Sequence, residues 1–375
     1  MSGFNFEGNR RLVIKVGSSL LIGEDGHVHR EWLQGLAHDV ARLHAEGHEL
    51  LIVSSGAIAI GSTVLGINKR RAKLTDLQAA AAAGQVQLVH AYQEALAAHR
   101  IVAAQILLTP GDTEDRRRFL NARGTLSRLL AQSVVPIINE NDTVATEEIR
   151  YGDNDRLAAR VSQLVMADVL VLLSDVDGLY SADPGKDSSA QHIAEVHKIT
   201  DDILLAAGET RSDVGSGGMA TKVQAARIAT HAGCSTVVTN GAIKRPLMAL
   251  ANGGRHTVFH AQGSPAVARK QWLAGVLEVC GELCLDDGAI DALQHGNSLL
   301  PVGVTAVNGE FRRGDVLTLL NSNGVEVGRG LAEYSSREST SLLGRRSEQI
   351  EEILGYRGRS VLVHRDELVL FENDI

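Results

Sequence analysis

The chain has 375 residues, of which 44% are hydrophobic, 22% charged and only 3% aromatic. This length suggests about two domains, and the scarcity of aromatics predicts cores of Ala, Val, Leu and Ile, as in parallel α/β sheets. The net charge of −8 argues against a general polyanion-binding protein. The sequence shows neither a signal peptide nor an apolar run of about 18 residues, so we expect a cytoplasmic protein without a membrane span.

Short apolar runs alternate with longer segments of helical periodicity as far as residue 260. Strands are expected at 12–16, 49–54, 101–108, 134–138, 168–173, 236–239 and 257–260. Helices are expected at 30–46, 57–65, 75–99 with a break near Gly84, 113–132 and 219–231. This alternation predicts a parallel sheet with helices on both faces.

The pattern changes after the turn-like residues 262–265. From there the segments are short, β-rich and punctuated by glycine, which predicts a compact β-barrel of about 100 residues with a helix near 347–354. Residues 276–375 hold nine arginines, no lysine and 17 acidic residues, so this part carries all of the net charge of −8. We therefore expect a first domain at 1–262, a linker at 263–275 and a second domain at 276–375.

Two clusters of Asn and Asp bracket the stretch NENDTVATEEIRYGDND at 139–155. The first cluster, Asn139–Asp142, follows the expected strand 134–138. The second, Asp153–Asp155, opens a helical segment. Ligands of open α/β sheets bind where the carboxyl ends of the strands meet, so we expect a binding site here. Helix caps and turns are the structural alternative for any single Asn or Asp.

Three other turns carry groups suited to binding anions. Lys15 lies inside an apolar strand, where charge is costly unless it faces a site, and Gly17 follows it. Ser55 and Gly56 turn a strand into a helix whose N–H groups can bind a carboxylate or phosphate. The loop GSGGMATK at 215–222 opens a helix and places a lysine one turn inside it. The structural alternatives are an edge-strand lysine, an ordinary turn and a flexible glycine loop.

Two lysines, several N–H turns and a group of Asp and Asn suit phosphoryl transfer, in which positioning and charge neutralisation supply most of the catalysis. The loop at 215–222 is neither a Walker A sequence nor a dinucleotide GxGxxG, and no serine elbow or kinase HRD motif occurs. No general base is evident. A carboxylate acceptor is already ionised at neutral pH and needs none, so the pattern favours a carboxylate as acceptor.

Histidine and cysteine add no expected metal site. The three cysteines form neither a disulfide framework nor a zinc motif. Three histidine pairs have the spacing of metal ligands, but no second liganding cluster accompanies any of them, so we expect ordinary surface or core histidines: His27 and His29, His44 and His48, and His256 and His260.

Seven segments in chain order, LVIKVGSS, LIVSSGAIAIG, RRRFLNARGTL, VPIINENDTVAT, YGDNDRLAA, LLSDVDGLYSADP and GSGGMATKVQAA, resemble the amino acid kinase family, in particular its members that phosphorylate glutamate. The tail, with GNSLLPVGV, FRRGDVL and LGYRGRSVLVHRDELVL, resembles a PUA domain. The resemblance covers essentially the whole chain. It implies a three-layer αβα sandwich with a mainly parallel central sheet, the amino acid kinase fold, plus a small C-terminal β-barrel that is PUA-like.

The resemblance also implies roles for single residues. Lys15 and Lys222 would hold the transferring phosphoryl group from two sides, and Asp155 would orient them. Asp142 would take the ammonium of glutamate, and Asn154 its α-carboxylate region. The expected substrate-binding residues are Ser55, Gly56, Asn139, Asp142 and Asn154. The expected nucleotide-binding residues are Lys15, Gly17, Ser174, Asp175, Ser216, Gly217, Gly218, Met219, Ala220, Thr221 and Lys222.

The implied cofactors are ATP and Mg²⁺, with the metal held largely by phosphate and water and no protein ligand assigned. The implied substrate is L-glutamate, and the implied reaction opens proline biosynthesis. Proline is expected as a feedback inhibitor at the same site, with residues 143–152 as a lid. A glutamyl phosphate reductase is the expected partner, and a homo-oligomer the expected state.

Two alternatives remain open. A family member that acts on acetylglutamate would have a substrate without an ammonium group and would not need Asp142. PUA domains elsewhere bind RNA, so an RNA-binding or regulatory protein is the alternative from another class. The charge of −8 on residues 276–375 opposes the phosphate contacts that supply most non-specific affinity, so nucleic acid is not the expected partner.

Overall fold

The computed structural model describes residues 3–69, 71–144, 154–208, 218–274 and 279–371. The chain divides into two compact units, Met1–Pro265 and Ala266–Ile375. Helix α11 (Pro265–Ala274) lies within the span that the sequence suggests as a linker. Among the described residues, no helix has the length and apolar character needed to cross a membrane.

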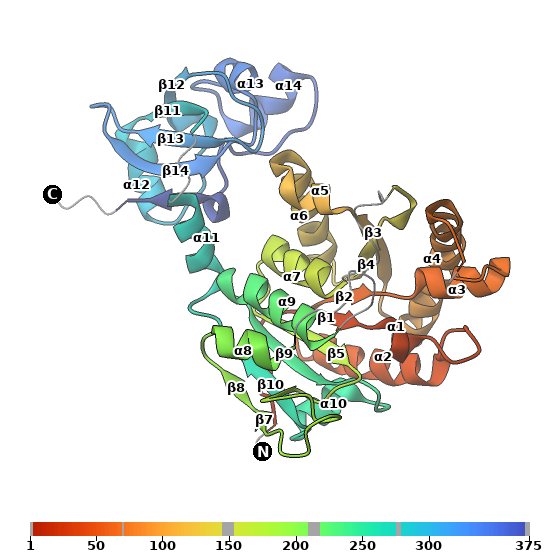
Figure 1. Ribbon diagram of the computed structural model, residues 1–375. Coiled ribbons are helices and arrows are strands. Elements are labelled where there is room, and N and C mark those ends of the chain that lie inside the picture. The colour runs from red at the N-terminus through yellow and green to blue at the C-terminus, as the bar shows by residue number, and fades with distance from the viewer. Residues whose placement is uncertain (1–2, 70, 145–153, 209–217, 275–278, 372–375) are drawn as a thin grey trace. The chain divides into compact units, whose positions relative to one another are not determined.

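An eight-stranded sheet forms the centre of the first unit (Figure 1), with the strand order β3-β4-β2-β1-β5-β9-β10-β8. Its strands are β1 (Arg11–Val16), β2 (Glu49–Ser54), β3 (Ala103–Leu108), β4 (Val135–Glu140), β5 (Val169–Ser174), β8 (Glu195–Val196), β9 (Ser235–Asn240) and β10 (His256–Phe259). All neighbours are parallel except β9 and β10. The expected mainly parallel sheet is confirmed.

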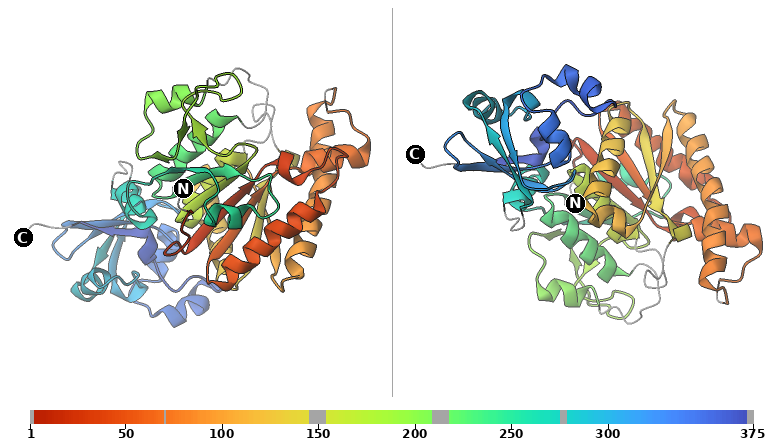
Figure 2. Two further views of the ribbon diagram at one scale, coloured as in Figure 1. Left: turned by 90° about the horizontal axis from the view of Figure 1, so that it is seen from below. Right: turned by 90° about the horizontal axis from the view of Figure 1, so that it is seen from above.

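Helices cover both faces of this sheet (Figures 1 and 2). One apolar core contains side chains of α2 (Arg30–Ala45) and α4 (Leu74–Ala97). A second core contains side chains of α6 (Arg116–Leu130), α7 (Asn154–Val165) and α9 (Met219–His231). The three-layer sandwich is therefore confirmed. Its shorter helices are α1 (Ser18–Leu21), α3 (Ala57–Leu65), α5 (Pro110–Glu114), α8 (Asp201–Ala206) and α10 (Pro246–Ala251).

Strand β1 shows how the sequence assigns its side chains to the two faces. Successive residues of a strand point to opposite faces. Leu12, Ile14 and Val16 belong to the core with α2 and α4, whereas Val13 belongs to the core with α7 and α9. Lys15 shares the parity of Val13, so its side chain extends from the face that α7 and α9 cover.

Two helical expectations are wrong. Helix α4 runs without a break through Gly84. This glycine lies where α4 crosses α3 at close range. A Cβ on Gly84 would lie 1.9 Å from the carbonyl oxygen of Ala57 in α3, so only glycine fits there. The expected helix 113–132 is divided at Asp115, whose carboxylate accepts a hydrogen bond from the Arg118 N–H at 2.8 Å and caps α6.

The first unit also contains elements that the sequence pattern does not reveal. Strands β6 (Leu179–Tyr180) and β7 (His192–Ile193) form a small antiparallel pair of their own. Strand β8 has only two residues and pairs with β10 at the edge of the main sheet. Two-residue strands are too short to show any periodicity, which explains why they go unnoticed.

The second unit contains a five-stranded sheet with the order β12-β11-β13-β14-β15. Its strands are β11 (Gly281–Leu285), β12 (Val304–Asn308), β13 (Val316–Leu320), β14 (Glu326–Leu331) and β15 (Leu368–Leu370). Its helices are α12 (Asp287–Gln294), α13 (Ser336–Ser341) and α14 (Ile350–Leu354). A separate apolar core, which includes Leu283, Leu319 and Val363, holds this unit together. The expected small β-rich domain is confirmed.

Candidate functional site

The carboxyl ends of β1, β2, β4 and β5 meet at one edge of the central sheet. Lys15 of β1 is in register with Val53 of β2 and with Leu172 of β5, so the residues that follow these strands are neighbours. Strand β1 lies at the centre of this edge, with β2 as its neighbour on one side and β5 as its neighbour on the other. This is the kind of edge at which open α/β sheets bind ligands.

Lys15, Asp155 and Lys222 come from three different elements and meet at this edge. The Lys15 Nζ lies 2.6 Å from Asp155 Oδ1, and the Lys222 Nζ lies 3.3 Å from Asp155 Oδ2. Asp155 therefore contacts one lysine with each carboxylate oxygen. All three side chains are buried, and Asp155 is only 1% exposed.

The local sequence explains how these three groups are positioned. The strand alternation turns Lys15 toward α7 and α9. Asp155 is the second residue of α7, where the helix dipole favours a carboxylate. Lys222 lies in the first turn of α9, and the Thr221 hydroxyl just before it donates a hydrogen bond to Asp155 Oδ2 at 3.0 Å.

The electrostatics of this cluster favour an anion. Burial by itself would raise the pKa of Asp155, but the ammonium groups of Lys15 and Lys222 outweigh burial and hold that pKa below its usual range. Asp155 is therefore ionised at neutral pH. Two ammonium groups thus lie against one carboxylate, and this arrangement suits the binding of a phosphate.

A second cluster is built from amides and lies beside the end of β2. The Asn154 Nδ2 lies 2.6 Å from the Ser55 Oγ, 3.1 Å from the Asn139 Oδ1 and 3.2 Å from the Ser54 carbonyl oxygen. Its other polar atom, Oδ1, is buried and has no hydrogen-bond partner among the described residues. That atom can only accept, so it fits an N–H donor of a ligand.

Gln85 belongs to the same amide cluster, although sequence reasoning does not find it. Its Oε1 accepts a hydrogen bond from Asn139 Nδ2 at 2.9 Å, which fixes the orientation of that amide. The residue lies in the Ala-rich helix α4, where a single glutamine gives no sequence signal of a binding site. Tyr92 has a similar place: its hydroxyl lies 3.0 Å from Ser54 Oγ in the buried interior.

Gly56 has a conformation that only glycine adopts readily. Its φ is +116°, and it caps the N-terminus of α3 directly after the serines that end β2. A Cβ there would also lie 3.2 Å from the Ile22 side chain. The turn therefore keeps Ser55 at the site and leaves the first N–H groups of α3 available to an acceptor.

Asp142 lies in a short 3₁₀ turn, Asp142–Val144, after β4. No hydrogen bond or ion pair between described residues joins it to either cluster. Desolvation raises the pKa of Asp142 to about 6. Of the expected lid at 143–152, only Thr143 and Val144 are described, and the remainder lies outside the described residues.

The expected nucleotide-binding residues fall at three strand and helix ends. Gly17 follows β1, and a Cβ at this position would make only ordinary van der Waals contacts, among them one of 3.9 Å to the Lys15 Nζ. The Ser174 hydroxyl at the end of β5 donates to Asp175 Oδ1 at 2.9 Å. Gly218 caps α9, which begins Met219, Ala220, Thr221. No side chain among the described residues caps this helix, so its first N–H groups suit an anion. Ser216 and Gly217 lie outside the described residues.

A cavity of about 410 Å³ lies elsewhere, lined by residues that include Phe4, Phe6 and His48. Phe6 precedes β1 and His48 precedes β2, so this cavity is at the opposite ends of the strands. It contains neither of the two site lysines. The chemistry of the strand ends, rather than the volume of a cavity, therefore locates the candidate site.

Comparisons with known proteins agree with this architecture. A model of the amino acid kinase family matches residues 10–240, and a model of the PUA domain matches residues 281–354. A protein of Paramagnetospirillum magneticum named glutamate 5-kinase is 53% identical over 362 residues, which cover 96% of this chain and 98% of that protein. A protein of Rhizobium rhizogenes, also named glutamate 5-kinase, is 52% identical over 96% of this chain and 93% of that protein. A protein of Rhizobium meliloti, named glutamate 5-kinase 1, is 52% identical over 97% of this chain and 93% of that protein. The chain therefore belongs to the amino acid kinase family and carries a PUA domain toward its C-terminus.

Proposed function

We propose that this protein transfers the γ-phosphoryl group of ATP to the γ-carboxylate of L-glutamate, in the cytoplasm, as the first step of proline biosynthesis. The observation that carries the chemistry is the buried cluster of Lys15, Asp155 and Lys222 at the carboxyl edge of the sheet. The choice of substrate is supported by the relatives named glutamate 5-kinase, which match 96% or more of the chain.

The cluster would act mainly by positioning and by charge neutralisation. Lys15 approaches from β1 and Lys222 from α9, so a phosphoryl group between them would meet an ammonium on each side. Asp155 keeps both side chains extended toward that position because each of its oxygens contacts one Nζ. The γ-carboxylate of glutamate attacks phosphorus, the bond to the β-phosphate oxygen breaks, and an acyl phosphate and ADP result.

The residues present also fit ATP and Mg²⁺. Gly17 lies beside the Lys15 ammonium, and no side chain among the described residues caps the start of α9, which suits phosphate oxygens. Both oxygens of Asp155 contact lysines, so this carboxylate is not a free metal ligand. Mg²⁺ would therefore be held by phosphate oxygens and water, and it would neutralise charge on the β- and γ-phosphates.

The amide cluster and Asp142 would bind the amino acid. The buried Asn154 Oδ1 needs a donor, and the α-ammonium of glutamate supplies one. This differs from the role that the resemblance implies for Asn154, which is contact with the α-carboxylate region. Ser55 and the first N–H groups of α3 behind Gly56 suit a carboxylate. Asp142, once ionised, would pair with the same ammonium.

Regulation and assembly belong to the same proposal. Proline has an α-carboxylate and a secondary ammonium. Asn154 and Asp142 would bind these groups as they bind those of glutamate, so proline would compete with glutamate. An acyl phosphate hydrolyses readily, which favours transfer to a glutamyl phosphate reductase. We also expect a homo-oligomer, which light scattering would test.

The test is ATP-dependent formation of hydroxamate from the acyl phosphate, with glutamate and with N-acetylglutamate in parallel reactions. We expect product only with glutamate, and less product when proline is added. Product with N-acetylglutamate alone would contradict the proposed substrate and favour the acetylglutamate alternative. No nucleotide turnover with either acid, together with retention on RNA at 0.15 M salt, would favour the RNA-binding alternative.

A further inference from the structure

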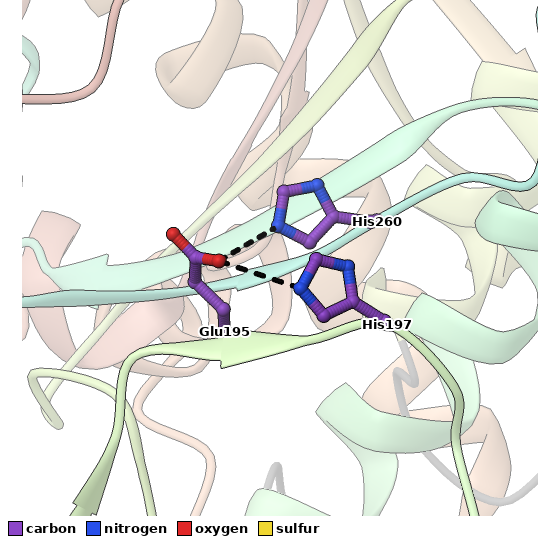
Figure 3. A group of neighbouring side chains, drawn as sticks. All are labelled: Glu195, His197 and His260. Atoms are coloured by element: carbon purple, nitrogen blue, oxygen red, sulfur yellow. Dashed lines mark ion pairs between the residues drawn. The ribbon is translucent and has the colours of Figure 1, made fainter.

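Glu195, His197 and His260 meet on one side of the sheet edge formed by β8 and β10 (Figure 3). Strand β8 pairs with β10 in parallel, with Glu195 opposite Val258 and Val196 opposite Phe259. The ladder continues one step, because the His260 N–H donates to the Val196 carbonyl oxygen at 2.9 Å. His197 and His260 are therefore next to each other in register.

Strand alternation directs these side chains away from the core. Val196 and Phe259 belong to the apolar core with α7 and α9. The residues on either side of them in each strand point the opposite way. Glu195, His197 and His260 consequently share one face, and their side chains are 62%, 75% and 37% exposed.

The ligand atoms of the three residues lie close together, at separations somewhat longer than those in a metal-bound site. One ligand atom of each residue lies within 4.8 Å of the ligand atoms of the other two. The Glu195 Oε2 is 3.5 Å from the His197 Nε2 and 3.8 Å from the His260 Nε2. The two rings are stacked, with centroids 4.5 Å apart and planes 12° apart. Figure 3 shows the carboxylate facing the nitrogen edges of both rings.

An independent observation points to a ligand at this place. The His260 Nε2 atom is itself buried and makes no hydrogen bond with any described residue. A buried polar nitrogen without a hydrogen bond is costly. A cation between this nitrogen, the His197 Nε2 and the Glu195 carboxylate would satisfy all three groups together.

We propose that Glu195, His197 and His260 bind a divalent transition-metal ion, with Zn²⁺ as the best match. Two imidazoles and one carboxylate are a common zinc ligand set, and water would take the fourth position. Bonds of about 2.0–2.2 Å in a tetrahedral site place ligand atoms about 3.3 Å apart. Exposed side chains can contract to that spacing from their present separation. Mg²⁺ is not the matching ion, because it prefers oxygen ligands.

The bound ion would fasten the edge of the central sheet. Strand β8 contributes only two residues to the ladder, and His197 follows it at the start of the connection to α8. Coordination by His197 and His260 would link this connection to β10 by two further bonds. The site lies outside the Lys15–Asp155–Lys222 cluster, so the proposal is independent of the proposed kinase activity.

The test uses the full-length protein after treatment with EDTA, titrated with Zn²⁺ in competition with a chromophoric chelator. We expect one tight site in the wild type. His197→Ala and Glu195→Gln should each weaken it at least ~tenfold, because even the loss of a partner of a metal ligand costs 10–100-fold. His197 is exposed and at a bend, so its replacement leaves the core intact. Co²⁺ should give visible absorption bands without a thiolate band in the wild type and lose them in His197→Ala.

The matched control is His90→Ala. His90 and Glu94 form a similar exposed His–Glu pair at 3.5 Å, and no third ligand joins them among the described residues. We expect wild-type Zn²⁺ affinity in this variant. Phosphoryl transfer with Mg²⁺ should be unchanged in His197→Ala, because His197 does not belong to the Lys15–Asp155–Lys222 cluster. Equal Zn²⁺ affinity in the wild type, His197→Ala and Glu195→Gln, or no Zn²⁺ binding by the wild type, would overturn the proposal.

Discussion

Asp155 shows how one side chain can organise two others that belong to distant parts of the chain. Lys15 and Lys222 are 207 positions apart in the sequence, yet each Nζ contacts a different oxygen of the same carboxylate. Removing one member of a buried ion cluster leaves the others uncompensated. The catalytic and structural effects of changing Asp155 itself would therefore be mixed, and the lysines are the better targets for mutation.

Lys15→Met and Lys222→Met remove one ammonium each and keep most of the side-chain volume. We expect each variant to lower kcat by about 10²–10³-fold, the effect of losing one charge-stabilising donor at a transition state. KM for glutamate should change less, because the amide cluster remains. Steady-state kinetics with ATP and glutamate would measure both constants.

Lys244→Met is the control for these variants. Lys244 is an exposed lysine that pairs with Glu31 at 2.7 Å, and Glu31 belongs to neither site cluster. Its replacement should leave kcat unchanged. Wild-type kcat in either Lys15→Met or Lys222→Met would rule out a transfer role for that lysine.

Asp142 should make both glutamate use and stability depend on pH. Burial raises its pKa from 3.8 to about 6 in the folded protein. Its ionised form is the one that would bind an ammonium, so kcat/KM for glutamate should rise between pH 5 and pH 7. In Asp142→Asn, this rise should be absent and KM should be higher. An unchanged pH profile in the variant would remove Asp142 from the glutamate site.

The stability effect of Asp142 has the opposite sign. A carboxyl whose folded pKa lies above its unfolded pKa stabilises the fold while it is protonated and loses that contribution as pH rises through about 6. Asp142→Asn should therefore raise the free energy of unfolding at pH 8 by about 1–2 kcal/mol. The gain should be smaller at pH 5. Urea unfolding at the two pH values would measure it, and an equal gain at both would contradict the assignment.

At the scale of elements, the crossing of α3 and α4 supports the turn that carries Ser55 and Gly56. Gly84 in α4 packs against the backbone of Ala57 in α3, and Gly61 packs against Ala80 in the same way. Close approach of the two helices thus depends on two glycines. Because α3 starts directly behind Gly56, a shift of α3 would displace this turn, for which we propose glutamate binding.

Gly84→Ala should lower the free energy of unfolding by about 3 kcal/mol, because its Cβ would overlap backbone atoms that cannot move aside. KM for glutamate should rise as well. Chemical denaturation would measure the first effect. Gly111→Ala is the matched control, since the nearest atom to its Cβ would be 3.8 Å away in ordinary contact. Equal stability of the two variants would show that α3 and α4 tolerate separation.

Most elements of the first unit follow from sequence because each is long enough to show a period. The central strands and the helices α2, α3 and α9 are of this kind. The predicted break at Gly84 is wrong because a glycine in a helix signals either a break or a close contact, and only the partner helix decides between them. The two-residue strands β6, β7 and β8 have no period, so sequence reasoning cannot find them.

The same limit applies to single residues. Lys15 stands out in the sequence because it interrupts an apolar strand, and Lys222 because it follows a glycine loop. Gln85 and Tyr92 give no such signal, since both are ordinary residues of a long helix. Sequence spacing pairs His260 with His256, whereas strand register places it beside His197. Contacts across strands depend on register, which local spacing does not contain.

At the scale of the whole molecule, the described candidate site residues all belong to the first unit. That unit has two apolar cores of its own, and the second unit has a third. A fragment of residues 1–265 should therefore fold and retain most of the kcat for glutamate phosphorylation. Kinetics of this fragment beside the full chain would test it, with Lys15→Met in the fragment as the inactive control. A folded but inactive fragment would assign the PUA domain a direct part in catalysis.

The contacts of Asp155 also have a consequence for turnover. A phosphate oxygen that reaches Lys15 or Lys222 must share the ammonium with a carboxylate already in place. In the proposed site, the carboxylate would thus act as a permanent counter-ion that moderates the affinity for polyanions, ADP included. A site with two unshared buried ammonium groups would retain its nucleotide product. We infer that Asp155 contributes to rapid product release as well as to alignment.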